Sequence, residues 1–206
     1  MAAQVVGRLT GDANRWMVEC LEIAPGDRVL DVGCGPGLGV AFAAEGATGG
    51  LAAEGATGGL AAEGAISGFV AGVDASPTML RQARRRNRAA IGLGRVEVVA
   101  ADAARLPFPD GHFDKAWSLN SLQFWPAPEV ALRELGRVVS PGGPVLVGLM
   151  ARSDDRPGLP RPRWLARTAE LMGDSGVGDV GFETRTFGGV VHWGLLGRST
   201  GTALLG

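Results

Sequence analysis

The segment VLDVGCGPG, residues 29–37, passes from an apolar run directly into a turn in which every second residue is glycine. Gly33, Gly35 and Gly37 follow one another at spacing two, and glycine lets a backbone turn tightly and approach a ligand closely. The helix expected after them offers unpaired backbone N–H groups. We therefore predict that a polar ligand binds at this loop.

A carboxylate precedes the loop, because Asp31 stands two residues before Gly33. A dinucleotide-binding loop has the spacing G-x-G-x-x-G and holds a pyrophosphate, beside which a carboxylate is unfavourable. Asp31 suits a ligand with a cationic end, such as an α-amino group. Plain loops also carry glycine, but spacing and charge together favour an adenosyl amino acid over a dinucleotide.

The elements that must hold this loop are short apolar runs that alternate with helical patterns, which is typical of βαβ units and a mostly parallel sheet. The expected strands are 28–32, 69–73, 95–99, 113–119 and 144–149, followed by a closing pair at 180–185 and 190–196. The expected helices are 12–21, 76–88, 128–138 and 164–172. A chain of 206 residues accommodates one such α/β domain.

Composition and charge exclude several kinds of partner. The 20 basic and 21 acidic residues nearly balance, so the net charge creates no field that would attract a polyanion, and nucleic acid is disfavoured as a partner. Cys20 and Cys34 form no C-x-x-C or Cys/His cluster, so we expect neither a disulfide nor a metal site. No stretch approaches the ~20 apolar residues of a membrane helix, and a cytoplasmic protein without membrane contact is expected.

One segment is repeated. Residues 43–51, AAEGATGGL, recur unchanged as residues 52–60, and a partial copy, AAEGA, follows at 61–65. The unit is a third glycine and buries almost no apolar surface, unlike the longer units of solenoid proteins. We interpret it as a tandem duplication that forms a protruding loop at about 43–65.

The glycine segment resembles motif I of the class I S-adenosylmethionine-dependent methyltransferases, D/E-x-G-x-G-x-G, and the chain is similar to small-molecule enzymes of methyltransferase type 11 over about residues 14–197. The resemblance implies an α/β, Rossmann-like, seven-stranded and mostly parallel sheet with helices on both faces and an antiparallel last strand. It divides the chain into an N-terminal helical segment at 1–27, which is a candidate substrate lid, an S-adenosylmethionine-binding domain at 28–197, and a tail at 198–206.

The resemblance also explains an anomalous spacing. In the family an acidic residue that ends the second strand binds both ribose hydroxyls, and GVDAS places Asp74 there. Asp74 lies 41 residues after Gly33, whereas about 20 are expected of such a unit. Removing two nine-residue repeats leaves 23. The spacing and the duplication therefore account for each other.

Further cofactor contacts follow from the same resemblance. The segment AADAARLPF resembles the end of the family's third strand, so Asp102 would accept a hydrogen bond from the adenine amino group, and the backbone of Ala103 would lie near the ring. A role as a turn or helix cap is the alternative for Asp102. The full set of expected cofactor-binding residues is Asp31, Gly33, Cys34, Gly35, Gly37, Asp74, Ala75, Asp102, Ala103 and Asn120.

Residues after the fourth strand are the expected acceptor wall, because ligands in open α/β sheets lie beyond the carboxyl ends of the strands. Here they are Asn120, Ser121, Gln123, Phe124 and Trp125. We expect Gln123 and Trp125 to bind substrate, and core packing is the alternative for the two aromatic residues. The N/D-P-P-Y/F motif of amino-methylating relatives is absent from SLNSLQFWP, which disfavours nucleobase and glutamine amides as acceptors.

Methyl transfer from a sulfonium needs a base only when the acceptor must lose a proton. His192, near the acceptor side, is a weak catalytic candidate, and His112 is interpreted as a surface turn residue. The expected function is methylation of a small-molecule acceptor by a monomer or homodimer. An NAD(P)-binding oxidoreductase and a non-catalytic S-adenosylmethionine-binding protein are the alternatives, whereas an aminopropyltransferase would need an acidic residue where Asn120 stands.

Overall fold

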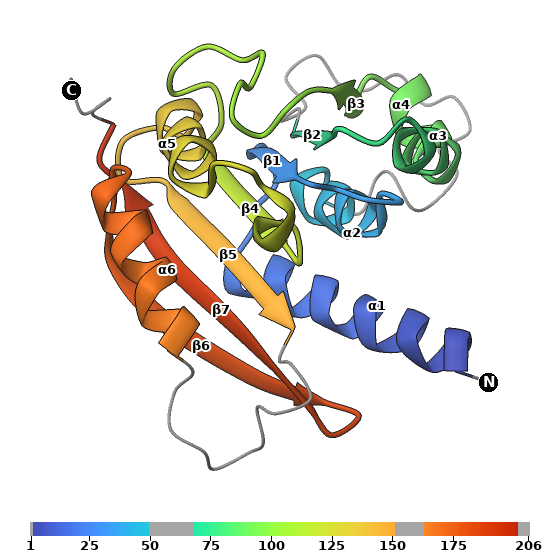
Figure 1. Ribbon diagram of the computed structural model, residues 1–206. Coiled ribbons are helices and arrows are strands. Elements are labelled where there is room, and N and C mark those ends of the chain that lie inside the picture. Colours follow the sequence, from blue (N-terminus) through green and yellow to red (C-terminus); the bar gives the residue numbers. More distant parts are fainter. Residues whose placement is uncertain (1, 50–67, 151–162, 202–206) are drawn as a thin grey trace.

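Seven strands form one mixed sheet in the order β3-β2-β1-β4-β5-β7-β6 (Figure 1). The computed structural model describes residues 2–49, 68–150 and 163–201. The strands are β1 Arg28–Val32, β2 Phe69–Asp74, β3 Val96–Ala100, β4 Lys115–Leu119, β5 Pro144–Met150, β6 Val177–Phe187 and β7 Val190–Ser199.

The centre of the sheet is parallel. β1 pairs with β2 on one side and β4 on the other, so Asp31 lies opposite both Gly72 and Trp117. Only β7 runs antiparallel to its neighbours, between β5 and β6. The predicted sheet, with its antiparallel last strand, is confirmed. The strand order reverses between β1 and β4, which is where ligands bind in open α/β sheets.

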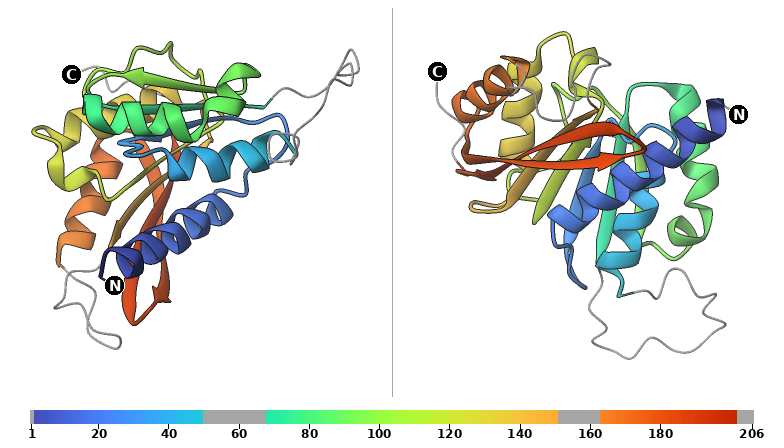
Figure 2. Two further views of the ribbon diagram at one scale, coloured as in Figure 1. Left: turned by 90° about the vertical axis from the view of Figure 1, so that its right-hand side faces the viewer. Right: turned by 90° about the horizontal axis from the view of Figure 1, so that it is seen from below.

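Helices cover both faces of the sheet (Figure 2). The helices are α1 Ala2–Cys20, α2 Leu38–Ala47, α3 Pro77–Arg86, α4 Arg88–Gly92, α5 Pro128–Val138 and α6 Arg163–Asp174, with a short 3₁₀ turn, η1, at Leu122–Phe124. One buried cluster joins α1–α4 to one face of the sheet, and a second joins α5 and α6 to the other. Residues 29–32 of β1 are all buried, as a strand covered on both faces requires. In the described part of the chain, no helix is long and apolar enough to cross a membrane.

The structure corrects several expected boundaries. The helix expected at 76–88 ends at Arg86, because the Asn87 side-chain amide donates to the carbonyl oxygens of Ala83 and Gly37, both at 3.0 Å, and ends the first helix before α4 begins. Phe113 forms an isolated bridge with Val139 instead of starting β4. β6 begins three residues earlier than expected, and α1 begins ten residues earlier.

The repeated segment is only partly the loop that we predicted. Residues 43–47 of the first copy form the second half of α2, and Ala43, Ala44 and Ala47 are buried against the sheet. Thr48 ends the helix, and its hydroxyl donates to the carbonyl oxygen of Ala44 at 2.6 Å. The prediction is therefore wrong for residues 43–47, because three alanines at helical spacing supply a small apolar face. The rest of the repeat, from residue 50, lies outside the described residues.

Candidate cofactor and acceptor site

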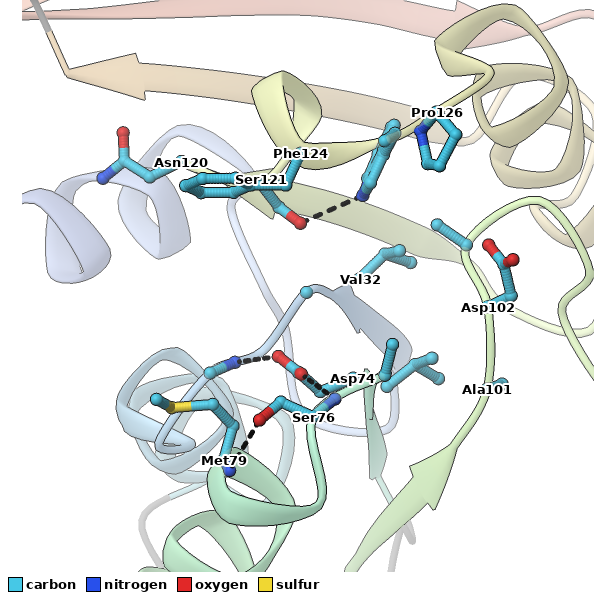
Figure 3. A pocket seen from close by; sticks show the side chains of 16 residues that line it. Val32, Asp74, Ser76, Met79, Ala101, Asp102, Asn120, Ser121, Phe124 and Pro126 are labelled. Carbon is cyan, nitrogen blue, oxygen red and sulfur yellow. Dashed lines mark hydrogen bonds between the residues drawn. The ribbon is translucent and has the colours of Figure 1, made fainter.

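A pocket of about 530 Å³ lies at the carboxyl ends of β1, β2, β3 and β4, where the strand order reverses (Figure 3). Pockets of this size hold small ligands and cofactors. The loops after these four strands and the first turn of α3 form most of its wall. Its lining residues are Val32, Gly33, Gly35, Val73, Asp74, Ala75, Ser76, Met79, Ala101, Asp102, Ala103, Asn120, Ser121, Phe124, Trp125 and Pro126.

The three loop glycines have positive φ angles of 77°, 52° and 74°, which side chains rarely allow, but each has a different neighbour. A Cβ atom on Gly33 would collide with the side chain of Ser121. A Cβ atom on Gly35 would meet nothing within 4 Å, so this glycine faces open space in the pocket. A Cβ atom on Gly37 would lie 2.8 Å from the backbone of Ala83. The third glycine therefore permits α3 to pack on the loop and does not line the pocket.

Asp74 ties the glycine loop to the start of α3. Its carboxylate accepts a hydrogen bond from the backbone N–H of Gly35 at 2.9 Å and another from the backbone N–H of Ser76 at 2.7 Å (Figure 3). Each of the two carboxylate oxygens receives one of these bonds, and each keeps acceptor capacity for a ligand hydroxyl. Asp74 therefore has a scaffold role that the sequence did not reveal, together with its place in the pocket wall.

Asp102 lies farther along the wall, just after β3 (Figure 3). Its Oδ1 accepts from the backbone N–H of Ala104 at 2.9 Å, which fixes the side chain in a local turn. Asp102 is nonetheless exposed and lines the pocket beside Ala103. Both expected positions, as turn residue and as ligand contact, are therefore compatible with this geometry.

Asp31 is buried behind the loop and does not line the pocket. A Cβ atom on Gly39 would lie 2.9 Å from Oδ2 of Asp31 and 2.6 Å from Oδ1 of Asn14, so the Asp31 carboxylate and α1 meet at the start of α2. Burial, and then the nearby Asp74 carboxylate, raise the pKa of Asp31 well above its ordinary value. Any effect of Asp31 on a ligand is therefore exerted by its charge from behind the loop. Cys34 is also buried and outside the pocket wall.

The segment after β4 forms the other side of the pocket. Asn120 has a positive φ of 55°, and its backbone N–H donates to the carbonyl oxygen of Gly148 at 2.8 Å. This turn sends Ser121 and Trp125 into the pocket wall, and Phe124, with 77% of its surface exposed, stands at the pocket's edge. Gln123 does not line the pocket, because its side-chain amide turns back and donates to the carbonyl oxygen of Asn120 at 2.8 Å.

Sequence reasoning placed Ser121 in the acceptor wall without a specific role and did not single out Ser76 or Met79 as site residues, but all three line the pocket. Ser76 was expected only as the start of the helix at 76–88, and its hydroxyl accepts a hydrogen bond from the backbone N–H of Met79 at 3.4 Å. A first helical turn that directly follows the acidic end of β2 has to border the same pocket. The position of Asp74 therefore contained the signal that could have identified Ser76 and Met79.

Neither histidine lies in the pocket. His192, on β7, is completely buried against Phe187, with ring centroids 5.3 Å apart, and burial lowers its pKa. Both of its ring nitrogens lack a hydrogen-bond partner among the residues that the structure describes. His112 lies at the opposite end of the sheet, where the Arg28 guanidinium contacts its ring, and burial and that charge lower its pKa.

Comparison with known proteins identifies the fold and the family. Residues 48–147 match the family described as "Methyltransferase domain"; the match begins after the glycine loop, within the first repeat. The chain is 34% identical over 129 residues to Methyltransferase GfsG of Streptomyces halstedii, covering 62% of this chain and 39% of that protein. It is 32% identical over 163 residues to 27-O-demethylrifamycin SV methyltransferase of Amycolatopsis mediterranei, covering 78% and 50%.

Among solved structures, a SAM dependent methyltransferase from Aquifex aeolicus superposes with a TM-score of 0.67, at 20% identity, over 90% of this chain and 89% of that one. The chain spans half or less of the length of the two curated relatives. The chain belongs to the class I S-adenosylmethionine-dependent methyltransferases, and the cofactor of this family is S-adenosylmethionine.

Proposed function

We propose that this chain catalyses methyl transfer from S-adenosylmethionine to a small, partly apolar acceptor. The observation that carries the proposal is that Gly35, Asp74, Asp102 and Ser121, from the ends of four different strands, line the same pocket. Their polar groups fit the cofactor, because it has ribose hydroxyls and an adenine amino group that need acceptors, and an amino-acid end that needs polar partners.

We assign the ribose hydroxyls to Asp74 and the adenine amino group to Asp102, with Ala75 and Ala103 as neighbours of the nucleoside. The amino-acid end then lies at Gly33 and Gly35, where the loop backbone allows close approach. Asp31 favours its ammonium group by charge from behind the loop. When bound, the cofactor supplies a methyl group activated by a positively charged sulfur.

The acceptor side is formed by Asn120, Phe124 and Trp125, with one polar and two aromatic side chains at the pocket's edge. Two aromatic rings exclude water and suit a partly apolar acceptor, and the side-chain amide of Asn120 can orient a polar group on it. These side chains would position the acceptor and exclude water from the reacting atoms, which suffices for displacement at an activated methyl group. The name of the Amycolatopsis relative, which methylates a demethylrifamycin, supports an organic small molecule as acceptor.

His192 can act as a base only if the acceptor reaches its buried imidazole. It lies beneath α1, whose Trp16 packs against Phe187, which in turn packs against His192. An acceptor that entered between α1 and β7 would reach the imidazole, and residues 1–27 would then act as a substrate lid. An acceptor bound at Phe124 and Trp125 alone would be methylated without this base.

Calorimetry and a turnover assay test the proposed function. Titration with S-adenosylhomocysteine should give saturable binding to the wild-type chain, whereas NADH should give none. Incubation with S-adenosylmethionine and a panel of hydroxylated, aminated and thiol-bearing small molecules should then release S-adenosylhomocysteine with at least one acceptor. Binding without turnover across the panel would favour a non-catalytic cofactor-binding protein, and absence of binding would refute the proposal.

A further inference from the structure

Ser121 and Gly33 contact each other directly in the pocket wall, although 88 positions separate them in the sequence. The side chain of Ser121 occupies the space that a Cβ atom on Gly33 would fill. Parallel pairing of β1 with β4 brings the two strand ends together and so produces this contact. The serine hydroxyl therefore lies directly on the first glycine of the loop, where the amino-acid end of the cofactor is proposed to bind.

A second contact fixes the direction of this hydroxyl. The indole N–H of Trp125 donates a hydrogen bond to Oγ of Ser121 at 3.0 Å (Figure 3). A serine hydroxyl has one donor and two acceptor sites, and the indole N–H is a donor only. The indole therefore occupies an acceptor site of Oγ, and the hydroxyl proton stays available to the pocket. A hydroxyl held in this state is a donor for an anionic group.

We propose that Ser121 binds the carboxylate of the cofactor's amino-acid end and that Trp125 is a positioning residue that acts through Ser121. The inference rests on the proposed function, since it assigns a further contact within the same site. It gives the zwitterionic end two partners, with its ammonium group favoured by Asp31 and its carboxylate bound by the Ser121 hydroxyl. It also connects two sites, because the Trp125 ring lines the acceptor side.

A consequence of this connection is coupling between the two ligands. A carboxylate bound to Ser121 holds Oγ in place, and Oγ holds the Trp125 indole that borders the acceptor. Cofactor binding then orders the acceptor wall, and by thermodynamic linkage the acceptor strengthens cofactor binding by the same factor. The acceptor should consequently bind more weakly to the free chain than to the chain with S-adenosylhomocysteine.

A double-mutant cycle tests the contact. Ser121→Ala removes the hydroxyl, and Trp125→Phe removes the N–H but keeps an aromatic ring. We expect each variant to bind S-adenosylhomocysteine about 10- to 100-fold more weakly, as loss of one hydrogen bond to a charged group implies. The double variant should bind no more weakly than Ser121→Ala alone, because Trp125 acts through Ser121. Additive losses would contradict the proposal.

Ligand and protein controls separate binding from general damage. 5′-Methylthioadenosine lacks the amino-acid end, so both variants should bind it as tightly as the wild type does. Ser118→Ala and Trp164→Phe are the matched controls, because each removes a buried polar group without a partner in the described structure, outside the pocket wall. These controls should leave the affinity for S-adenosylhomocysteine unchanged.

The outcomes distinguish this inference from the proposed function. If the wild type binds S-adenosylhomocysteine and the Ser121 variant binds it equally well, only the carboxylate assignment is wrong. If the Ser121 and Trp125 variants lose equal affinity for S-adenosylhomocysteine and 5′-methylthioadenosine, the serine has only a structural role. If the wild type binds neither ligand, the proposed function itself fails.

Discussion

The carboxylate of Asp74 accepts a hydrogen bond from the backbone N–H of Gly35 at 2.9 Å, so the end of β2 holds the glycine loop that follows β1. The whole duplicated segment lies between these two residues in the chain. The strands keep a continuous parallel register, with Asp31 opposite Gly72, despite the added residues. We therefore expect that the link between α2 and β2 can change length while the cofactor site keeps its geometry.

Replacing Asp74 should weaken cofactor binding and also loosen the loop. Asp74→Ala removes the proposed ribose contacts, and we expect a loss of about 2 to 4 kcal/mol in the binding free energy of S-adenosylmethionine. It also leaves the N–H groups of Gly35 and Ser76 without their acceptor, so the melting temperature of the free protein should fall. Calorimetry and thermal unfolding measure the two effects separately.

Asp74→Asn separates these two roles, because its amide oxygen retains one neutral acceptor. It should destabilise the free protein less than alanine does and still bind the cofactor more weakly than the wild type. Glu45→Gln, on an exposed position of α2, is the control for loss of a charge. Wild-type affinity in Asp74→Ala would overturn the site assignment.

Asp31 should favour ligand binding at the expense of stability. Its pKa in the folded protein lies above its ordinary value of 3.8, so the folded state binds the proton more tightly than the unfolded state. The resulting contribution to stability is largest at low pH and declines as the pH rises from about 3.8 through the folded-state pKa. Asp31→Asn lacks this decline and should melt at a higher temperature than the wild type at pH 7.

The gain in Asp31→Asn should shrink as the pH falls and disappear below about 3.8, where the wild-type carboxyl is protonated in both states. The same variant should bind S-adenosylmethionine about 1 kcal/mol more weakly, because the ammonium group loses a nearby charge. 5′-Methylthioadenosine has no ammonium group and should bind both proteins alike. A neutral-pH melting temperature below that of the wild type would show that the carboxylate has a stabilising partner instead.

Asp102 can be tested by changing the ligand as well as the residue. Asp102→Ala should reduce the affinity for S-adenosylhomocysteine by about 1.5 to 3 kcal/mol, the cost of losing a hydrogen bond to a charged acceptor. The exposed position of Asp102 implies that the fold survives. The inosine analogue of the ligand lacks the adenine amino group, so it should lose much less affinity. Equal losses for both ligands would disprove the proposed contact.

For His192 we expect a pH dependence of stability opposite to that of Asp31. Burial places its folded-state pKa below the ordinary value of 6.5, so protonation favours the unfolded chain. Its stabilising contribution is complete above about 6.5 and is lost as the pH falls below that value. His192→Leu should therefore narrow the difference in melting temperature between pH 8 and pH 5.

Cofactor affinity should be unchanged in His192→Leu, because the residue lies outside the pocket. His112→Asn is the control for loss of a histidine with a lowered pKa at the opposite end of the sheet, and it should affect neither cofactor affinity nor turnover. Loss of turnover in His192→Leu with intact cofactor binding would favour the base, whereas wild-type turnover would exclude it. An unchanged pH dependence of melting would contradict the structural placement of the imidazole.

The sheet was predictable because a buried parallel strand is apolar along its length, and the glycine loop was predictable because its spacing is local. Contacts across the pocket were not. Ser121 meets Gly33 only through the pairing of β1 with β4, and no local pattern encodes that distance. Gln123 was expected to bind substrate, and its side-chain amide instead donates a hydrogen bond within its own turn and lies outside the pocket wall. Gly37 matches the ligand motif, yet its lack of a side chain serves the packing of α3.

The repeated segment allows a deletion that leaves every helical residue of α2 unchanged in type. Removing residues 43–60 places the third AAEGA, residues 61–65, where residues 43–47 now stand. The buried alanines of α2 are thus replaced by identical alanines, and the interval from Gly33 to Asp74 falls from 41 to 23 residues.

We expect this deletion variant to fold and to bind S-adenosylhomocysteine within about twofold of the wild type, because Asp74 still reaches Gly35. Its stability should rise by about 1 kcal/mol or less, since closing a shorter loop costs less entropy. Loss of the Thr48 cap opposes part of this gain. A variant lacking residues 52–60 alone keeps that cap and should lie between the two proteins in melting temperature. If the full deletion folds but binds the ligand markedly more weakly, the repeat contributes to the cofactor site.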